Sequence, residues 1–228
     1  MPRKIRVAAG GVVYHVLNRA VGRADLFHKP SDYAAFEKIL AQSNERLAVP
    51  VLAYCLMPNH WHLVLWPRKD GDLSKFMRWL TVTHAQRHHA HYKAVGTGPV
   101  YQGRFKSFPV QDDRHLLIVC RYVERNPLRA NLVSRAEAWM WSSLHQRRMG
   151  HPSPFLLAEE DWPLQRPADW LQWVNRPQTA KEEAAVVQSI RRGRPFGEDA
   201  WQRQTARRLS LLASLNPTHR APRKTKKS

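Results

Sequence analysis

Two apolar runs joined by a two-residue turn constrain the fold most strongly. Residues 51–57 read V-L-A-Y-C-L-M and residues 60–66 read H-W-H-L-V-L-W, with Pro58 and Asn59 between them. An unbroken apolar run of seven residues is typical of a strand that is buried on both faces. So short a connection predicts that the two strands pair antiparallel. We therefore expect an antiparallel hairpin whose first strand is buried on both faces.

The surrounding segments alternate in their periodicity. From the sequence we predict a strand at residues 11–20, a helix that begins at Ser31 or Asp32, a helix at 73–92, a strand at 100–110, and a helix that Asp112 or Asp113 caps and Asn126-Pro127 ends. The order is then strand, helix, strand, strand, helix, strand, helix. This order predicts an α+β fold with a ferredoxin-like split β-α-β antiparallel sheet, helices on one face, and one further helix.

The composition changes after about residue 150, where prolines and tryptophans become frequent. We expect a domain at residues 1–150 and a C-terminal extension at 151–217. The extension should contain two helices, at residues 180–192 and 198–212. The last segment, 218–228, is a basic tail without acidic residues, which predicts disorder.

The charge balance narrows the class of partner. There are 37 Lys and Arg residues against 18 Asp and Glu, so the net charge is +19. Such a field attracts polyanions and favours nucleic acid, although a solubility surface or a ribosome-binding surface would have a similar composition.

The two cysteines lie in apolar runs and indicate no disulfide. With no signal peptide or transmembrane span predicted, we expect a cytoplasmic, nucleoid-associated protein with no membrane partner.

A His-x-His pair begins the second strand of the hairpin. Residues two apart on a strand point to the same face, so His60 and His62 present two imidazoles side by side. Imidazole ligands suit Mn, Zn or Fe, and Mg when oxygen ligands assist. The alternative is two unrelated surface histidines.

A tyrosine in the predicted helix that Asn126-Pro127 ends is the candidate nucleophile. Tyr122 and Asn126 are four residues apart and share one helix face, with Arg121, Arg125 and Arg129 nearby. Guanidinium groups and a metal-polarised phosphate would help a tyrosine to attack as a phenolate. The alternative is a core tyrosine followed by a helix-ending Asn-Pro.

Three segments in this order resemble the REP-associated tyrosine transposases. They are M-P-N-H-W-H at 57–62, Y-Q-G-R-F-K at 101–106 and R-Y-V-E-R-N-P-L-R-A at 121–130. These proteins are single-tyrosine HUH nucleases, relatives of the transposases of small bacterial insertion sequences. The segment G-R-P-F-G at 193–197 and Trp201 are less specifically similar to the C-terminal extension of one branch of the family.

The resemblance implies a mechanism and a set of site residues. Tyr122 would attack a DNA phosphate and form a 5′-phosphotyrosine bond, and a divalent cation, Mg²⁺ or Mn²⁺, would be held by His60, His62 and Asn126. Insertion-sequence relatives have a glutamine where this chain has Asn126. The basic residues expected to bind DNA are Arg104 and Lys106 on the fourth strand, Arg114, Arg121, Arg125 and Arg129.

The resemblance also implies the substrate, a single-stranded or hairpin DNA of the REP palindrome type. Insertion-sequence relatives act as dimers that exchange tyrosine helices, whereas the REP-associated branch can act as a monomer, which we expect here. Two other functions are open: a non-catalytic DNA- or RNA-binding regulator, and a hydrolase in which a metal-bound water attacks.

Two further histidines lie four residues apart at the basic end of the helix at 73–92. His84 and His88 have a spacing that can hold zinc, but no carboxylate or cysteine lies nearby in the sequence. We expect a solvated or DNA-facing helix end.

Overall fold

The computed structural model describes residues 8–150 and 153–216. The predicted disordered tail at 218–228 lies outside the described residues. Four strands form one antiparallel sheet in the order β2-β3-β1-β4. Their bounds are Val13–Arg19 for β1, Val51–Met57 for β2, His60–Leu65 for β3 and Lys106–Val110 for β4. The predicted antiparallel hairpin of β2 and β3 and the ferredoxin-like α+β plan are confirmed, with β2 at one edge of the sheet.

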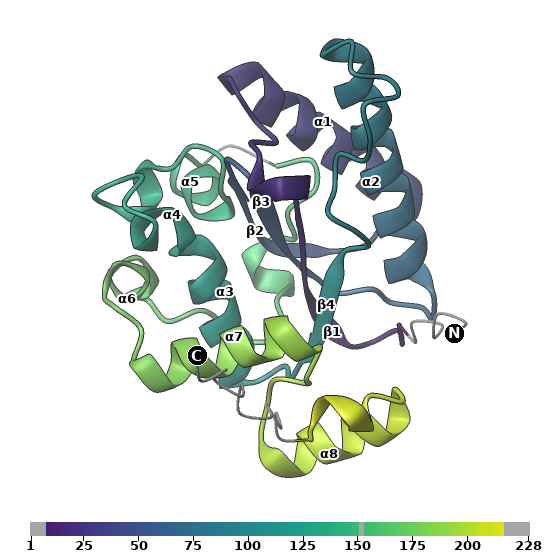
Figure 1. Cartoon of the computed structure of the whole chain (residues 1–228). Coiled ribbons are helices and arrows are strands. Elements are labelled where there is room, and N and C mark those ends of the chain that lie inside the picture. The colour runs from purple at the N-terminus through teal and green to yellow at the C-terminus, as the bar shows by residue number, and fades with distance from the viewer. Residues whose placement is uncertain (1–7, 151–152, 217–228) are drawn as a thin grey trace, which may run out of the picture.

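The two helices of the split β-α-β plan cover one face of the sheet (Figure 1). They are α1, Pro30–Leu47, and α2, Asp72–His91. Phe36 and Phe76 are fully buried between these helices and the sheet. Each such side chain stabilises the fold by about 1.5–3 kcal/mol when it leaves water. For α1 and α2 the predicted placement on one face is confirmed.

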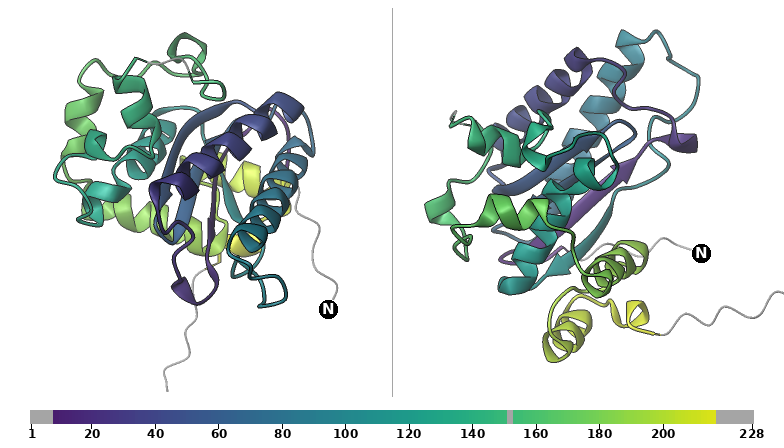
Figure 2. Two further views of the ribbon diagram at one scale, coloured as in Figure 1. Left: turned by 90° about the horizontal axis from the view of Figure 1, so that it is seen from above. Right: turned by 90° about the vertical axis from the view of Figure 1, so that its left-hand side faces the viewer.

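The helix α3, Arg114–Glu124, packs on the opposite face of the sheet, so the sheet carries helices on both faces (Figure 2). The Asp113 side chain caps this helix by accepting a hydrogen bond of 2.8 Å from the backbone N–H of His115. Residues 116–124 are all buried. The strand β2 packs beneath α3, which explains why every residue of β2 is apolar.

The rest of the chain is mostly helical. The remaining α-helices are α4 (Asn126–Arg129), α5 (Ser143–Arg148), α6 (Trp170–Asn175), α7 (Ala180–Arg192) and α8 (Asp199–Arg208), and the short 3-10 helices are Val21–Arg23, Ala136–Ala138, Glu159–Asp161 and Leu212–Ser214. The structure confirms the two helices predicted in the extension, of which α7 has the predicted bounds. The second, α8, ends at Arg208, earlier than predicted, and the backbone of Ser210 soon after it is left-handed with φ 56°. The helix α7 packs against α3 and β4, and α8 lies farther out (Figures 1 and 2).

The fourth strand is shorter than predicted, and the expectation that it begins at residue 100 is wrong. Tyr101 makes only an isolated bridge to Ala20, and the regular strand begins at Lys106. Between them, the Gly103 carbonyl accepts a hydrogen bond of 3.3 Å from the Asn18 side chain. Arg104 therefore lies in a loop and not on a strand.

The prediction that His84 belongs to a solvated or DNA-facing helix end is also wrong. Its side chain is 5% exposed, and its Nδ1 lies 2.7 Å from the hydroxyl of Tyr101, which also accepts a hydrogen bond from Trp61. The buried stripe of α2 continues at helical spacing from Leu80 to His84.

No helix in the described ranges is long and apolar enough to cross a membrane.

Candidate active site

A cavity of about 650 Å³ lies where the end of β1, the start of β3 and the loop before β4 meet α3 and α4. Seven of the predicted site residues line it: His60, His62, Arg104, Lys106, Tyr122, Asn126 and Arg129. They come from segments that are distant in the sequence, so the fold brings the three motifs together.

The alternation of β3 sets the two histidines on the same face. Their ring centroids are 5.0 Å apart, and Trp61 between them points into the core on the other face, where it is fully buried. His60 is half-buried at the mouth of the cavity, and His62 is only 3% exposed. Both imidazoles therefore belong to one site and are not independent surface groups.

Each histidine is held through its Nδ1 atom. Nδ1 of His60 lies 2.6 Å from Oδ1 of Asn59, and Nδ1 of His62 lies 2.9 Å from Nε2 of His15. In both rings Nε2 remains available to a ligand. Burial lowers the pKa of His60 to about 4, with help from Arg19 and Arg129, and burial likewise holds the pKa of His62 well below its usual value. Both rings are thus neutral at pH 7, the form that binds a metal ion.

Tyr122 faces this pair from α3. Its ring centroid lies 6.0 Å from that of His62, and its side chain is 4% exposed. The hydroxyl accepts a hydrogen bond of 3.1 Å from Arg129, whose guanidinium also lies 4.7 Å from the centre of the tyrosine ring. Burial raises the pKa of Tyr122, and Arg129 opposes that rise. Arg129 is therefore placed to stabilise a phenolate.

Asn126 is 2% exposed, and its Oδ1 accepts a hydrogen bond of 3.3 Å from Arg129. Its Nδ2 is buried without a partner. A buried polar atom without a partner is uncommon and points to an absent ligand or water. Rotating the amide by half a turn would make the oxygen available to that ligand, and the hydrogen bond from Arg129 would then be lost because Nδ2 cannot accept it.

The donor set fits a divalent cation. Among residues 8–150 and 153–216, no group of three or more His, Cys, Asp or Glu side chains could hold a metal ion. The two neutral imidazoles therefore need oxygen ligands from elsewhere, such as the amide of Asn126, water or a phosphate. Mixed imidazole and oxygen ligation suits Mn²⁺, and Mg²⁺ when the oxygens predominate.

Cations surround the cavity from several elements. Arg104, Lys106 and Arg129 are exposed at its rim, and α7 adds Arg191. Sequence reasoning missed Arg19, which also lines the cavity and has a buried Nε without a partner. It pairs across the sheet with His60. The ferredoxin-like strand order places β1 beside β3 and could have indicated Arg19.

The structure separates Arg121 and Arg125 from the cavity. Arg121 is 3% exposed and donates hydrogen bonds of 2.8 and 3.0 Å to the carbonyls of Arg176 and Pro177. Arg125 donates to two carbonyls at the end of α6. These guanidinium groups fasten the extension to α3, and we do not propose them as DNA ligands.

Arg114 is also outside the site. It is exposed at the start of α3 and lines a separate cavity of about 610 Å³ between α3, α7 and α8.

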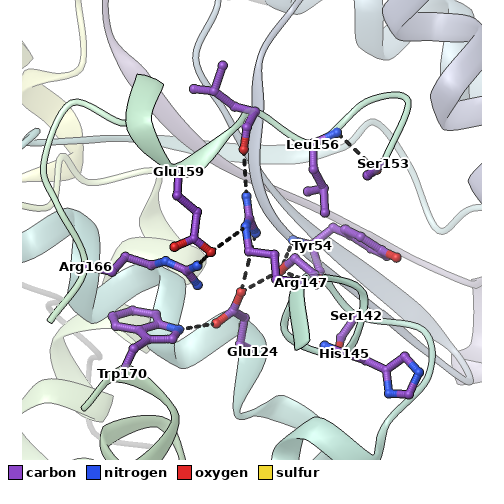
Figure 3. Close-up of polar contacts among 12 residues, drawn as sticks. Tyr54, Glu124, Ser142, His145, Arg147, Ser153, Leu156, Glu159, Arg166 and Trp170 are labelled. Carbon is purple, nitrogen blue, oxygen red and sulfur yellow. Dashed lines mark hydrogen bonds and ion pairs between the residues drawn. The ribbon is translucent and has the colours of Figure 1, made fainter. Parts of the chain in front are cut away.

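A buried carboxylate joins the tyrosine helix to the elements that follow it (Figure 3). Glu124 is fully buried and accepts hydrogen bonds of 2.7 Å from Ser143 and 2.8 Å from Trp170. Nη1 of Arg147 lies 3.9 Å from the same carboxylate. Since Glu124 is two residues from Tyr122, this network helps to fix the end of α3 that carries the tyrosine.

The fold agrees with that of known proteins, and the sequence identifies the family. The family model described as IS200-like transposase matches residues 9–126, more than half of the 228 residues. The chain belongs to the family of IS200-like transposases, which act on DNA.

Within that family, the chain is similar to REP-associated tyrosine transposases. It is 26% identical over 136 residues to a Haemophilus influenzae protein assigned to that group, a match that spans 56% of this chain and 74% of the relative. A solved structure of a REP-associated tyrosine transposase bound to a REP hairpin superposes with a TM-score of 0.52. That match covers 69% of this chain and 92% of the other at 17% identity, which indicates a shared fold.

Proposed function

We propose that this protein is a metal-dependent endonuclease and strand transferase that cuts single-stranded DNA through a 5′-phosphotyrosine intermediate. The observation that carries the proposal is the shared cavity in which Tyr122 of α3 faces His60 and His62 of β3. An ordinary core tyrosine would not need an arginine on its hydroxyl or a neighbouring pair of neutral imidazoles.

The proposed reaction is a transesterification at phosphorus. The Tyr122 oxygen forms a bond to the scissile phosphorus as its phenolic proton leaves, and the bond from phosphorus to the 3′ oxygen breaks. The released 3′ oxygen takes up a proton and becomes a 3′-OH. Since the phosphodiester is conserved as a tyrosine ester, the 3′-OH of another strand can reverse the step and join ends. Arg129 lowers the cost of the phenolate through its 3.1 Å hydrogen bond.

His60, His62 and Asn126 would hold the divalent cation, Mg²⁺ or Mn²⁺. When bound there, such a cation polarises a phosphoryl oxygen and stabilises charge at phosphorus. The side chains of Asn59 and His15 keep the two rings oriented through their Nδ1 atoms. This orientation presents both Nε2 atoms without a rearrangement on binding.

The rim of the cavity suits a single strand that ends in a hairpin. Its exposed cations come from different elements: Arg104 lies before β4, Lys106 on β4, Arg129 on α4 and Arg191 on α7. They can neutralise successive phosphates without reading sequence. The relative of similar fold is bound to a REP hairpin, which supports a hairpin of that type as the substrate.

We further propose that the active unit is a monomer, located with the nucleoid in the cytoplasm. Tyr122 and the two histidines of the same chain line one cavity, so no exchange of tyrosine helices is needed. Residues 1–150 would form the nuclease domain, with 151–217 as an extension that Arg121 and Arg125 hold in place. Light scattering should give the mass of one chain.

The test is a denaturing protein gel after incubation with a labelled DNA hairpin that carries a single-stranded arm, with Mg²⁺ or Mn²⁺. We expect a covalent protein–DNA adduct that is absent with EDTA and absent in Tyr122→Phe. Binding without cleavage would favour a non-catalytic regulator. Cleavage that persists in Tyr122→Phe would favour attack by water.

A further inference from the structure

We infer that His15 is a positioning residue that fixes the orientation and the tautomer of His62 so that Nε2 of His62 faces the metal. This inference rests on the proposed function, because it assigns His62 as a ligand. His15 itself does not line the cavity, and it would touch neither the metal nor the DNA.

The pairing of β1 with β3 brings the two histidines together. Leu17 is directly opposite His62, and His15 is two residues away on the same face of β1. This diagonal relationship places Nε2 of His15 2.9 Å from Nδ1 of His62. His15 is fully buried, so water does not compete for this hydrogen bond.

Proton positions follow from this contact. A metal on Nε2 of His62 needs the lone pair of that atom, so the proton must be on Nδ1. That proton can only be donated to Nε2 of His15, which must then accept and carry its own proton on Nδ1. Either ring could be the donor in this contact. With His15 as the acceptor, the hydrogen bond holds His62 in the tautomer that can bind a metal, the role that carboxylates and carbonyls have behind other metal-bound histidines.

The surroundings of His15 argue against a packing role. Its other nitrogen, Nδ1, is buried without a partner. The ring lies between His62 and Phe108, with centroid distances of 5.0 and 4.8 Å. A leucine or phenylalanine would suit such a site without an unpartnered polar atom. What the imidazole adds is the acceptor that His62 requires.

Three substitutions separate positioning from packing. In His15→Gln, the side-chain oxygen can reach the position of Nε2 and accept the same hydrogen bond. In His15→Asn the amide is one methylene shorter and cannot reach. In His15→Leu the site is filled, but no acceptor remains. His15→Gln therefore keeps the acceptor for His62, whereas His15→Asn and His15→Leu lose it.

The measurement is Mn²⁺ affinity, followed by electron paramagnetic resonance of free Mn²⁺ without DNA, together with urea unfolding in EDTA. We expect 10–100-fold weaker Mn²⁺ binding in His15→Leu and His15→Asn, and binding near that of the wild type in His15→Gln. The metal-free unfolding midpoint of His15→Leu should equal or exceed that of the wild type. Mn²⁺ binding by His15→Leu within twofold of the wild type would overturn the inference.

A second measurement does not depend on any variant folding. Long-range ¹H–¹⁵N spectra of the metal-free wild type should show His62 protonated at Nδ1 and His15 likewise protonated at Nδ1. Protonation of His62 at Nε2 would contradict the inference. The outcomes also distinguish the two proposals: Mn²⁺ binding without any covalent DNA adduct would refute the nuclease proposal alone. Absence of Mn²⁺ binding in the wild type would refute both the metal site and the role of His15.

Discussion

The guanidinium of Arg129 donates a hydrogen bond of 3.1 Å to the hydroxyl of Tyr122 and also reaches Oδ1 of Asn126. One exposed side chain thus contacts the proposed nucleophile and a proposed metal ligand. Burial raises the pKa of Tyr122, and the charge of Arg129 acts in the opposite direction. Arg129 is therefore the residue of α4 on which the reactivity of the tyrosine should depend most.

Arg129→Ala should reduce the single-turnover rate of DNA cleavage by about 10²-fold, the usual effect of losing one charge-stabilising donor. The unfolding midpoint should not change, because Arg129 is exposed. The matched control is Arg78→Ala, which removes an exposed arginine from α2, outside the cavity. Equal rates for Arg129→Ala and Arg78→Ala would rule out this role.

The double variant Arg104→Ala/Lys106→Ala should bind a single-stranded oligonucleotide with weaker salt dependence. Each lost phosphate contact lowers the slope of log affinity against log salt by about 0.7, so we expect a change of about 1.4. Fluorescence anisotropy across a salt series measures it. The pair Arg78→Ala/Arg148→Ala removes the same charge from exposed positions outside the cavity and should leave the slope close to that of the wild type.

Glu124→Gln should destabilise the fold by about 3–5 kcal/mol, since it removes the fully buried carboxylate beside the guanidinium of Arg147 and leaves that guanidinium only the exposed carboxylate of Glu159. Urea unfolding measures this effect. The control is Glu159→Gln, because Glu159 is 56% exposed and its ion pairs with Arg147 and Arg166 should contribute less than about 1 kcal/mol. Similar losses in both variants would mean that Glu124 is not the centre of the network.

The fold should lose stability as the pH falls below about 6.5. Burial lowers the pKa of both His15 and His84 to about 3. The unfolded chain takes up protons near pH 6.5, whereas the folded chain resists until about pH 3, so acid favours unfolding. Each group contributes about 1.4 kcal/mol per pH unit between these limits. The unfolding free energy is measured in EDTA at several pH values between 6 and 5. In His84→Gln its slope against pH should be smaller by about 1.4 kcal/mol per pH unit, the contribution of one proton. An unchanged slope would contradict this prediction.

Local patterns were sufficient to predict most of the fold. The apolar runs and their two-residue turn predicted β2 and β3, and helical spacing predicted α1, α2 and α7. The late start of the fourth strand, at Lys106, could not be predicted. It depends on a hydrogen bond between Asn18 and Gly103, which are distant in the sequence.

The site was predictable in part. The spacing in the sequence predicted that His60 lies beside His62 and that Tyr122 lies near Asn126. The family resemblance predicted that these two pairs belong to one site. The sequence could not separate Arg129, which points into the cavity, from Arg121 and Arg125, which bind carbonyls of the extension. They are spaced four residues apart, but Arg121 lies on α3, Arg129 lies on α4 and Arg125 lies between the two helices, so the break between α3 and α4 and the path of the extension distinguish them. His15 is a single residue in an apolar strand, and its role emerges only from the sheet register.

The most direct test of the central proposal is to map the covalent adduct by mass spectrometry. The protein is incubated with the hairpin and Mn²⁺, treated with nuclease and protease, and its peptides are searched for an added nucleotide. We predict one modified peptide, carrying a 5′-phosphonucleotide on Tyr122. A nucleotide on another residue, or cleaved DNA without any modified peptide, would contradict the assignment of Tyr122 as the nucleophile.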